Sequence, residues 1–467
     1  MIDRRIMTTG GNERSLSGTM IDKLASELRG HLIAIDDRDY DTVRKVWNGM
    51  VDKRPALIAR CTGSADVIAC VRFAREHDLL VSVRGGGHSA GGRALCDKGL
   101  MIDLSLMKGI RVDAVGRTAR AEPGLRLGEF DRETQAFGLA TTLGVASDTG
   151  IAGLTLGGGY GWLDGKYGLA CDNVLAADVV TAEGRLVTAS AEENADLFWA
   201  IRGAGANFGI VTSFKYQLHP VGPVVGGIVL YPLTQGKETL RFFHEFSATC
   251  PDEVSTVGLL LSAPDGTPAI GIAACFTGSV QEGERLMKPL RTFGAPMADL
   301  IAHRRYTEMQ SLFDQNWIPG QFNYWKTSLM REPTEATIEI LVEYAQKRPI
   351  PSSVIYFQQT HGAASRVKSG DTAFPHRFDH YDSGPWAIWQ DRSDTDRCIR
   401  WARECWDALR PFYEPSAYVN AVDDAISDDD ERVRSAYGAN FERLASLKKR
   451  YDPTNLFRLN ANIRPTV

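Results

Sequence analysis

The chain has 467 residues, 43% of them hydrophobic, and a formal net charge of −5 at pH 7. This length exceeds that of most single domains and allows a large buried core, so we expect two large subdomains that share an interface. Charges of both signs are dispersed and no basic block occurs, which argues against a nucleic-acid partner. No apolar run is long enough to cross a bilayer and residues 1–17 lack a signal-peptide core. We therefore expect a cytoplasmic protein without a membrane partner.

The first half of the chain is predicted to alternate strands and helices. Residues 55–83 have the pattern strand, helix, strand, with Ser64 as the expected helix cap and residues 79–83 as a buried strand. Further strands are predicted at residues 100–104, 110–112, 118–122, 177–181, 185–188 and 209–214. Helices are predicted at residues 127–137 and 197–201.

The composition changes near residues 220–223, which read Pro-Val-Gly-Pro. Beyond them the pattern predicts an antiparallel sheet backed by helices. The expected strands are residues 225–231, 255–261, 270–276 and 353–359, and the expected helices between them are residues 237–248 and 335–346. A last helix is predicted over residues 428–450, with Asp428, Asp429 and Asp430 at its N-terminus, where the helix dipole favours acidic side chains.

A glycine-rich loop follows the buried strand at residues 79–83. Residues 84–89 read Arg-Gly-Gly-Gly-His-Ser, and glycines leave backbone N–H groups unshielded by Cβ atoms. Such a loop can wrap an anionic pyrophosphate, and an ordinary strand-to-loop turn is the alternative. The fingerprint G-x-G-x-x-G is absent, so a Rossmann-type dinucleotide site is not predicted.

A second glycine cluster occupies residues 144–168 and contains nine glycines. Leu154, Leu156 and Trp162 are interleaved with these glycines, so the segment does not have the composition of a linker. Glycines between apolar residues indicate buried backbone that approaches a ligand closely. A flat ligand is therefore expected against this segment.

These two clusters and four other segments resemble the FAD-linked oxidases of the vanillyl-alcohol oxidase type, with a PCMH-type FAD-binding domain, in their berberine-bridge-enzyme-like branch. The matching segments are residues 84–89, 149–161, 167–173, 198–205, 207–211 and 451–457. The resemblance implies an α+β chain with a two-part FAD-binding domain and a substrate domain whose antiparallel sheet is backed by helices. The implied boundaries are 20–222 for the FAD-binding domain, 223–417 for the substrate domain and 418–467 for a segment that returns to the FAD-binding domain.

The resemblance also implies that FAD is bonded through its 8α-methyl carbon to the imidazole of His88. A neutral imidazole nitrogen is a competent nucleophile for that carbon, and a noncovalent flavin with His88 packed nearby is the alternative. Many relatives carry a second link from a cysteine, but the matching position here is Ala146, so one covalent bond is expected. In this respect the chain resembles bacterial hydroxynicotine oxidases. Cys171 is interpreted as a packed thiol.

Other cofactor contacts are implied by the same match. Thr149 and Gly150 are expected beside the isoalloxazine ring, and Ile210 and Val211 near the adenine half or the ribityl chain. Ile151 matches a position thought to control oxygen access, where oxidases usually carry a smaller residue, so the electron acceptor stays open. The full expected set is Arg84, Gly85, Gly86, Gly87, His88, Ser89, Ala146, Thr149, Gly150, Gly153, Leu154, Gly158, Gly159, Tyr160, Gly161, Asn173, Ile210, Val211 and Asn462.

The catalytic residues are less clear from the sequence. Family members often read Tyr-x-Asn-Tyr where this chain reads Tyr418-Val419-Asn420-Ala421, so the usual tyrosine base is missing. Tyr418 and Asn420 are candidates to orient the substrate, with Tyr418 as a substitute base or a core aromatic residue. Gln359 and His361 are the further candidates.

The strand at residues 353–359 offers glutamines and no carboxylate, so recognition of a cation is not evident from it. His376, Asp379 and His380 lack a further ligand cluster, so no metal site is expected. None of the eight cysteines forms a C-x-x-C pair, which suits reduced thiols.

The expected activity is hydride transfer from a C–H beside nitrogen or oxygen of a small organic substrate to covalent FAD, with dioxygen as the acceptor. Aromatic alcohols, sugars and cyclic amines all stay open as substrates. The alternatives are a redox-balanced flavin-dependent cyclase and a noncatalytic flavin or ligand carrier. The sequence does not indicate an oligomeric state.

Overall fold

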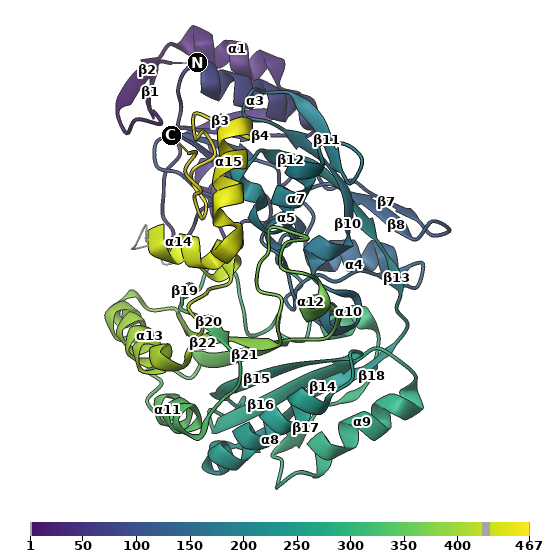
Figure 1. Ribbon diagram of the computed structural model, residues 1–467. Coiled ribbons are helices and arrows are strands. Elements are labelled where there is room, and N and C mark those ends of the chain that lie inside the picture. Colours follow the sequence, from purple (N-terminus) through teal and green to yellow (C-terminus); the bar gives the residue numbers. More distant parts are fainter. Residues whose placement is uncertain (1, 423–429, 467) are drawn as a thin grey trace.

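The computed structural model describes residues 2–422 and 430–466 in two lobes (Figure 1). The first lobe holds the N- and C-terminal segments, and the second lobe holds a large antiparallel sheet. The chain crosses to the second lobe after residue 220 and returns through α14 (Asp430–Tyr437) and α15 (Phe441–Tyr451). The predicted α+β class is therefore confirmed, while the predicted domain boundaries stay predictions.

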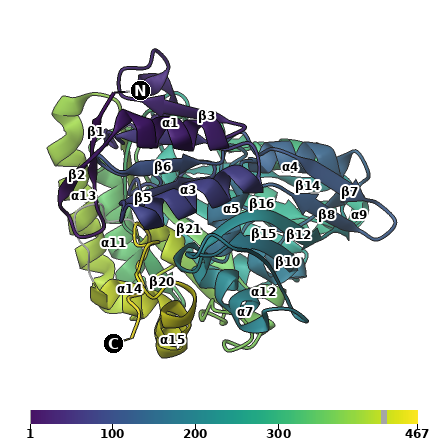
Figure 2. The same cartoon turned by 90° about the horizontal axis from the view of Figure 1, so that it is seen from above.

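The first lobe begins with a four-stranded sheet in the order β3 (His31–Ala34), β4 (Leu57–Arg60), β6 (Leu100–Asp103), β5 (Val81–Arg84). Strands β4, β6 and β5 run parallel, which requires a crossover, and α3 (Ser64–Glu76) supplies it between β4 and β5. Figure 2 shows α3 beside α1 (Gly18–Glu27) over this sheet. The residue that caps the helix is Gly63 rather than the predicted Ser64, and the Asp66 carboxylate in the first turn accepts a hydrogen bond from the Thr62 N–H.

A five-stranded antiparallel sheet completes the first lobe. Its order is β11 (Leu186–Ser190), β10 (Val174–Val180), β12 (Ile210–Gln217), β8 (Thr118–Ala121), β7 (Ile110–Asp113). The core on this sheet includes residues of α4 (Leu127–Gln135), α5 (Ile151–Leu156), α7 (Ala195–Ala204) and α15. The C-terminal segment is thus part of the first lobe's core.

The second lobe is built on a sheet in the order β17 (Ala298–Asp299), β14 (Val224–Pro232), β16 (Pro268–Phe276), β15 (Val254–Ser262), β21 (Val354–Thr360), β22 (His380–Trp389), β19 (Phe322–Trp325). Strand β18 (Ala302–Arg304) pairs with β14, and β20 (Ser328–Met330) pairs with β22. The helices α8 (Gly236–Thr249), α9 (Val280–Thr292), α11 (Glu335–Gln346) and α13 (Thr395–Leu409) pack on one face (Figure 1). The other face turns toward the first lobe.

Strand alternation decides which side chains of this sheet reach the interface between the lobes. On β21, Ile355 and Phe357 join the core with the helices, whereas Tyr356 packs on the opposite face. On β22, Trp389 joins the helices and Trp386 does not. Because the side-chain period of a strand is two, each strand contributes every second residue to the interface.

The shorter elements are α2 (Tyr40–Val43), β1 (Arg4–Met7) with β2 (Glu13–Leu16), β9 (Leu139–Ala140) with β13 (His219–Pro220), α6 (Asp164–Tyr167), α10 (Tyr306–Gln310) and α12 (Ala363–Arg366). The prediction of one continuous helix over residues 428–450 was wrong, because this region contains two helices, α14 and α15. A 3₁₀ turn at Gly438–Asn440 separates α14 from α15, and Gly438 has a φ of +48°. The prediction for Asp428 and Asp429 lies outside the described residues, and α14 begins at Asp430.

Among residues 2–422 and 430–466, no helix combines the length and the apolar character that a membrane crossing requires. The eight cysteines are unpaired.

Candidate functional site

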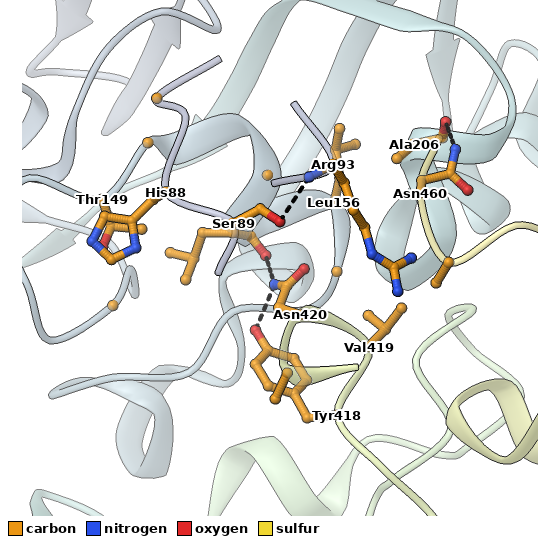
Figure 3. Close-up of a pocket in the computed structure, with 18 of the residues that line it drawn as sticks. His88, Ser89, Arg93, Thr149, Leu156, Ala206, Tyr418, Val419, Asn420 and Asn460 are labelled. Carbon is orange, nitrogen blue, oxygen red and sulfur yellow. Dashed lines mark hydrogen bonds between the residues drawn. The ribbon is translucent and has the colours of Figure 1, made fainter. Parts of the chain in front are cut away.

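The candidate site is a cavity between the two lobes (Figure 3). The first lobe contributes the two glycine clusters and the second lobe contributes residues of β19, β21 and β22. The C-terminal return contributes residues 418–421 and 459–461. Segments far apart in the sequence therefore meet around one cavity.

Backbone contact explains why the glycines are required there. A Cβ on Gly86 would lie 2.4 Å from the Gly150 Cα, and a Cβ on Gly150 would lie 2.5 Å from the Gly86 nitrogen. A Cβ on Gly157 would lie 2.1 Å from the Asn420 Oδ1. Gly87 adopts a φ of +71°, which glycine tolerates best. The two clusters thus form one surface of close-packed backbone along the cavity.

His88 projects into this cavity and has two partners that fix its ring. Its Nε2 lies 3.2 Å from the Asp148 Oδ1, and its ring stacks on Trp47 with centroids 4.3 Å apart. A carboxylate only accepts hydrogen bonds, so Nε2 carries a proton in this contact, and in the neutral imidazole the lone pair then lies on Nδ1. In the view of Figure 3 Thr149 overlaps His88, and both residues line the cavity. The ring is therefore oriented with one nucleophilic nitrogen.

The other end of the cavity contains a cation and several amides. Arg93 is the single arginine or lysine among the described lining residues, and its side chain donates a hydrogen bond to the Val422 carbonyl. Figure 3 shows Arg93 extending toward Val419 and Asn460. The Asn460 amide donates to the Ala206 carbonyl at 2.7 Å. This end suits an anionic group, because guanidinium groups pair well with phosphate oxygens.

Tyr418 lies at the centre of a hydrogen-bond network in the cavity wall. Its hydroxyl oxygen accepts hydrogen bonds from the Gly159 N–H at 3.1 Å and from the Asn420 side-chain amide at 2.8 Å. Burial raises the pKa of Tyr418, while these two donors act in the opposite direction. Its ring lies 4.3 Å from the Tyr160 ring, centroid to centroid. The Tyr418 oxygen is thus held in place with its own proton available for donation.

Asp382 supplies a carboxylate that the sequence did not reveal. It lies on β22 opposite Gln358 of β21, lines the cavity and is 3% exposed. The Tyr160 hydroxyl donates a hydrogen bond to its Oδ2. Burial raises the pKa of Asp382 to about 6, although the hydrogen bond from Tyr160, the nearby Thr327 hydroxyl and the charge of Arg432 favour the ionised form. A carboxylate with such a pKa can exchange protons near neutral pH.

The sequence of the chain is similar to those of known FAD-linked proteins. Residues 55–190 match the model of the FAD binding domain, and residues 417–464 match the model described as berberine and berberine like. The chain is 32% identical over 462 residues to the (R)-6-hydroxynicotine oxidase of Paenarthrobacter nicotinovorans, covering 96% of this chain and 99% of that protein. It is 31% identical over 459 residues to an FAD-linked oxidoreductase of Dictyostelium discoideum, covering 97% and 99%. The chain belongs to the berberine-bridge-enzyme-like family of FAD-linked oxidoreductases.

Solved structures agree with this assignment. The 6-hydroxy-D-nicotine oxidase of Arthrobacter nicotinovorans superposes with a TM-score of 0.86 at 30% identity, covering 94% of this chain and 98% of that one. A chitooligosaccharide oxidase gives a TM-score of 0.83 at 25% identity, covering 96% of this chain and all of the other. The predicted PCMH-type FAD-binding fold is confirmed, and the protein is an FAD-dependent oxidoreductase.

The residues of the cavity fit FAD. Gly86, Gly150 and Gly157 provide backbone that a flat ring system can approach without meeting Cβ atoms. Arg93 matches the charge of a pyrophosphate, and His88 lines the cavity with its ring held by Asp148. Arg93, Asp148 and Asn460 were not predicted from the sequence. The only available signal was for Arg93, which is a cationic residue shortly after the glycine loop.

Many of the predicted cofactor residues meet at the cavity, although their individual roles stay predictions. The predicted residues that line it are Gly85, Gly86, Gly87, His88, Ser89, Ala146, Thr149, Gly150, Gly153, Leu154, Tyr160, Tyr418 and Asn420. Those that do not line it are Arg84, Gly158, Gly159, Gly161, Asn173, Ile210, Val211 and Asn462. Arg84 instead donates to the Val43 carbonyl, and the Asn173 amide donates to the carbonyls of Tyr167 and Leu169.

Two proposed catalytic residues also lie elsewhere. Gln359 points to the helix side of β21, where it accepts a hydrogen bond from Thr256 and donates to the Ser247 carbonyl. Its neighbour Gln358 lines the cavity instead, as strand alternation requires. His361 is buried with its Nε2 2.9 Å from the Val254 carbonyl oxygen.

The position expected to control oxygen access is also resolved. Ile151 is fully buried in the core of the first lobe and does not line the cavity, whereas Thr149 does. The role of Ile151 in oxygen access, and with it the electron acceptor, stays a prediction.

Cys171 lies away from the cavity, next to the buried ion pair of Asp172 and Arg377, and burial raises the pKa of its thiol. Within the described residues, no cysteine lines the cavity. Likewise, the described residues contain no cluster of three or more side chains able to hold a metal ion. His376 contacts the carbonyls of Ala417 and Ala436, and His380 contacts that of Phe378.

Proposed function

We propose that the protein is an oxidase of a small organic amine or alcohol, with FAD attached covalently to His88 alone and with dioxygen as the electron acceptor. The observation that carries this proposal is the orientation of His88 in the cavity by Asp148 and Trp47, with Ala146 and not a cysteine at the second family position. The names of the hydroxynicotine and chitooligosaccharide oxidases support the oxidase class.

Bound FAD would supply a two-electron acceptor for the hydride. Residues of the chain would orient the substrate and accept its proton. Tyr418 can donate a hydrogen bond to the substrate heteroatom, because its oxygen is already held by Gly159 and Asn420. Asp382 is the candidate proton acceptor, since its buried carboxylate has a pKa of about 6 and lines the same cavity. Tyr418 and Asp382 together would take the role of the tyrosine base that family members often carry at the position of Ala421.

Acid precipitation tests the tether. We expect the yellow colour to stay with the denatured wild-type protein and the peptide containing His88 to carry the mass of FAD. His88→Ala should release all flavin on precipitation, whereas His303→Ala, an exposed histidine outside the cavity, should retain it. A wild-type pellet without colour would overturn the covalent attachment.

Oxygen consumption tests the acceptor. Candidate donors should bleach the flavin without air, and air should restore the colour with release of hydrogen peroxide. Turnover without peroxide would favour a redox-balanced cyclase, and failure of every donor to bleach the flavin would favour a carrier.

We also propose a cytoplasmic location. The eight unpaired cysteines support it, because they suit a reducing compartment. Cell fractionation tests this location, and recovery outside the cytoplasmic fraction would contradict it.

A further inference from the structure

The second lobe presents an aromatic wall to the cavity, made of Trp317, Trp325, Tyr356 and Trp386. The rings of Tyr356 and Trp386 stack with centroids 4.3 Å apart and planes 16° apart. Trp386 stacks in turn on Trp325, at 4.5 Å and 12°. Trp317 adds a tilted ring 5.2 Å from Trp386. Rings held in this way give a rigid apolar surface with little entropy left to lose on binding.

The aromatic wall offers few hydrogen-bonding groups. The indole N–H groups of Trp325 and Trp386 are buried rather than presented to the cavity. The Gln358 oxygen already accepts the Tyr356 hydroxyl. A sugar substrate needs several hydrogen bonds to its hydroxyl groups, because unpaired polar groups are costly to bury. This wall therefore suits a flat aromatic ring better than a sugar.

The charge beside the aromatic wall is negative. Asp382 lies on the same strand as Trp386 and four residues before it, so both side chains point to the same face of the sheet. Only one Asp382 oxygen holds the Tyr160 hydroxyl, and the other takes no hydrogen bond within the described residues. A buried carboxylate without a direct ion pair is costly, and a cationic ligand would offset that cost.

We infer that the substrate is a small aromatic compound carrying a basic amine, with its ring against the aromatic wall and its ammonium group beside Asp382. This inference rests on the proposed oxidase function and selects the amine from the amine and alcohol classes. The ammonium group gives one proton to Asp382, which leaves the neutral amine. With FAD bound, the adjacent C–H bond would break with its electron pair leaving as hydride to the flavin, and the carbon and nitrogen would form an iminium ion. Dioxygen takes up the two electrons with two protons as hydrogen peroxide.

Binding of inert probes to the FAD-loaded protein tests the inference. Benzamidine and benzamide share shape and ring, but only benzamidine is a cation at pH 7.5. We expect benzamidine to bind about tenfold more tightly than benzamide, because hydrogen bonds to charged groups are the stronger ones. The change in the visible flavin spectrum on titration gives each Kd. The amidine of cyclohexanecarboxylic acid tests the need for an aromatic ring and should bind more weakly than benzamidine.

Variants separate the contribution of the Asp382 charge to probe binding from that of the aromatic wall. Asp382→Asn should bring the affinities for benzamidine and benzamide to within about threefold, because the charge is lost while an oxygen stays for Tyr160. Asp379→Asn removes the same charge from an exposed position outside the cavity and should leave both affinities unchanged. Trp386→Leu should weaken both aromatic probes by a similar factor.

Equal affinity of the wild type for benzamidine and benzamide would overturn the inference, as would tighter binding of cellobiose. Neither result would contradict the proposed oxidase activity, because probe binding requires no turnover. Colour retention and peroxide release report on the oxidase separately.

Discussion

The Tyr160 hydroxyl donates a hydrogen bond to the Asp382 carboxylate and so joins the two lobes across the cavity. Tyr160 belongs to the second glycine cluster, and Asp382 belongs to β22. Both side chains are buried, where a hydrogen bond to an ionised group is at its strongest. The protonation state of Asp382 therefore depends on the first lobe as well as on its own strand.

We expect substrate-driven reduction of the flavin to slow as the pH falls through about 6, the value to which burial raises the pKa of Asp382. Protonation below this pH removes the proton acceptor and the negative charge together. Anaerobic stopped-flow measurements across pH 4.5–8 should show this acidic limb in the wild type and not in Asp382→Asn. An identical limb in the variant would assign the titration to another group.

Tyr418→Phe removes the hydroxyl that accepts the Gly159 and Asn420 hydrogen bonds. We expect kcat to fall by about 100-fold, which is typical when a positioned proton donor is lost. Two donors are left without a partner, so the melting temperature should also fall by a few degrees. Steady-state kinetics and a thermal melt separate the effects; unchanged kcat with a lowered melting temperature would make Tyr418 a core residue.

Asp148→Asn should slow covalent attachment of FAD, because Asp148 holds His88 Nε2 and leaves Nδ1 as the free nitrogen. We expect freshly purified variant to contain FAD that is partly released by acid, with the covalent fraction rising over hours. The ratio of acid-stable to total flavin measures this. Full attachment at the wild-type rate would show that Asp148 does not position the ring.

Gly86→Ala should prevent normal loading of FAD, because its Cβ would lie 2.4 Å from the Gly150 Cα and force the two loops apart. The matched control is Gly370→Ala, whose Cβ meets no other atom within 4 Å and which lies outside the cavity. The absorbance ratio of flavin to protein should fall steeply in the first variant and stay unchanged in the second. Normal loading of Gly86→Ala would refute this close approach.

Lys448→Met should destabilise the C-terminal return. The Lys448 ammonium is fully buried, lies 2.7 Å from the Asp452 carboxylate and donates to the carbonyls of Asn207 and Phe457. Removing one partner of a buried ion pair leaves an uncompensated charge, at a cost of about 3–5 kcal/mol. Urea denaturation measures the loss. The double variant Lys448→Met with Asp452→Leu should recover part of it, and a variant as stable as the wild type would contradict this reasoning.

Local pattern explains why most elements could be predicted. Strands β4, β15 and β16 and helices α8 and α11 lie within a few residues of their predicted positions, because each has a strong period or apolar run. Strand β22 was not predicted, since Gly384 and Pro385 interrupt its apolar pattern. This strand carries Asp382 and Trp386, so these two residues of the cavity could not be predicted from local pattern.

The sequence by itself determined the cofactor class and the family, because the glycine loops and His88 are contiguous motifs whose chemistry is local. Only the tertiary structure decided which residues share the cavity. Arg93 and Trp386 line the same cavity although they lie 293 positions apart in the chain (386 − 93), and no local pattern encodes their meeting. The glycine loop therefore identifies what the protein binds, whereas packing of the two lobes decides which atoms surround the substrate.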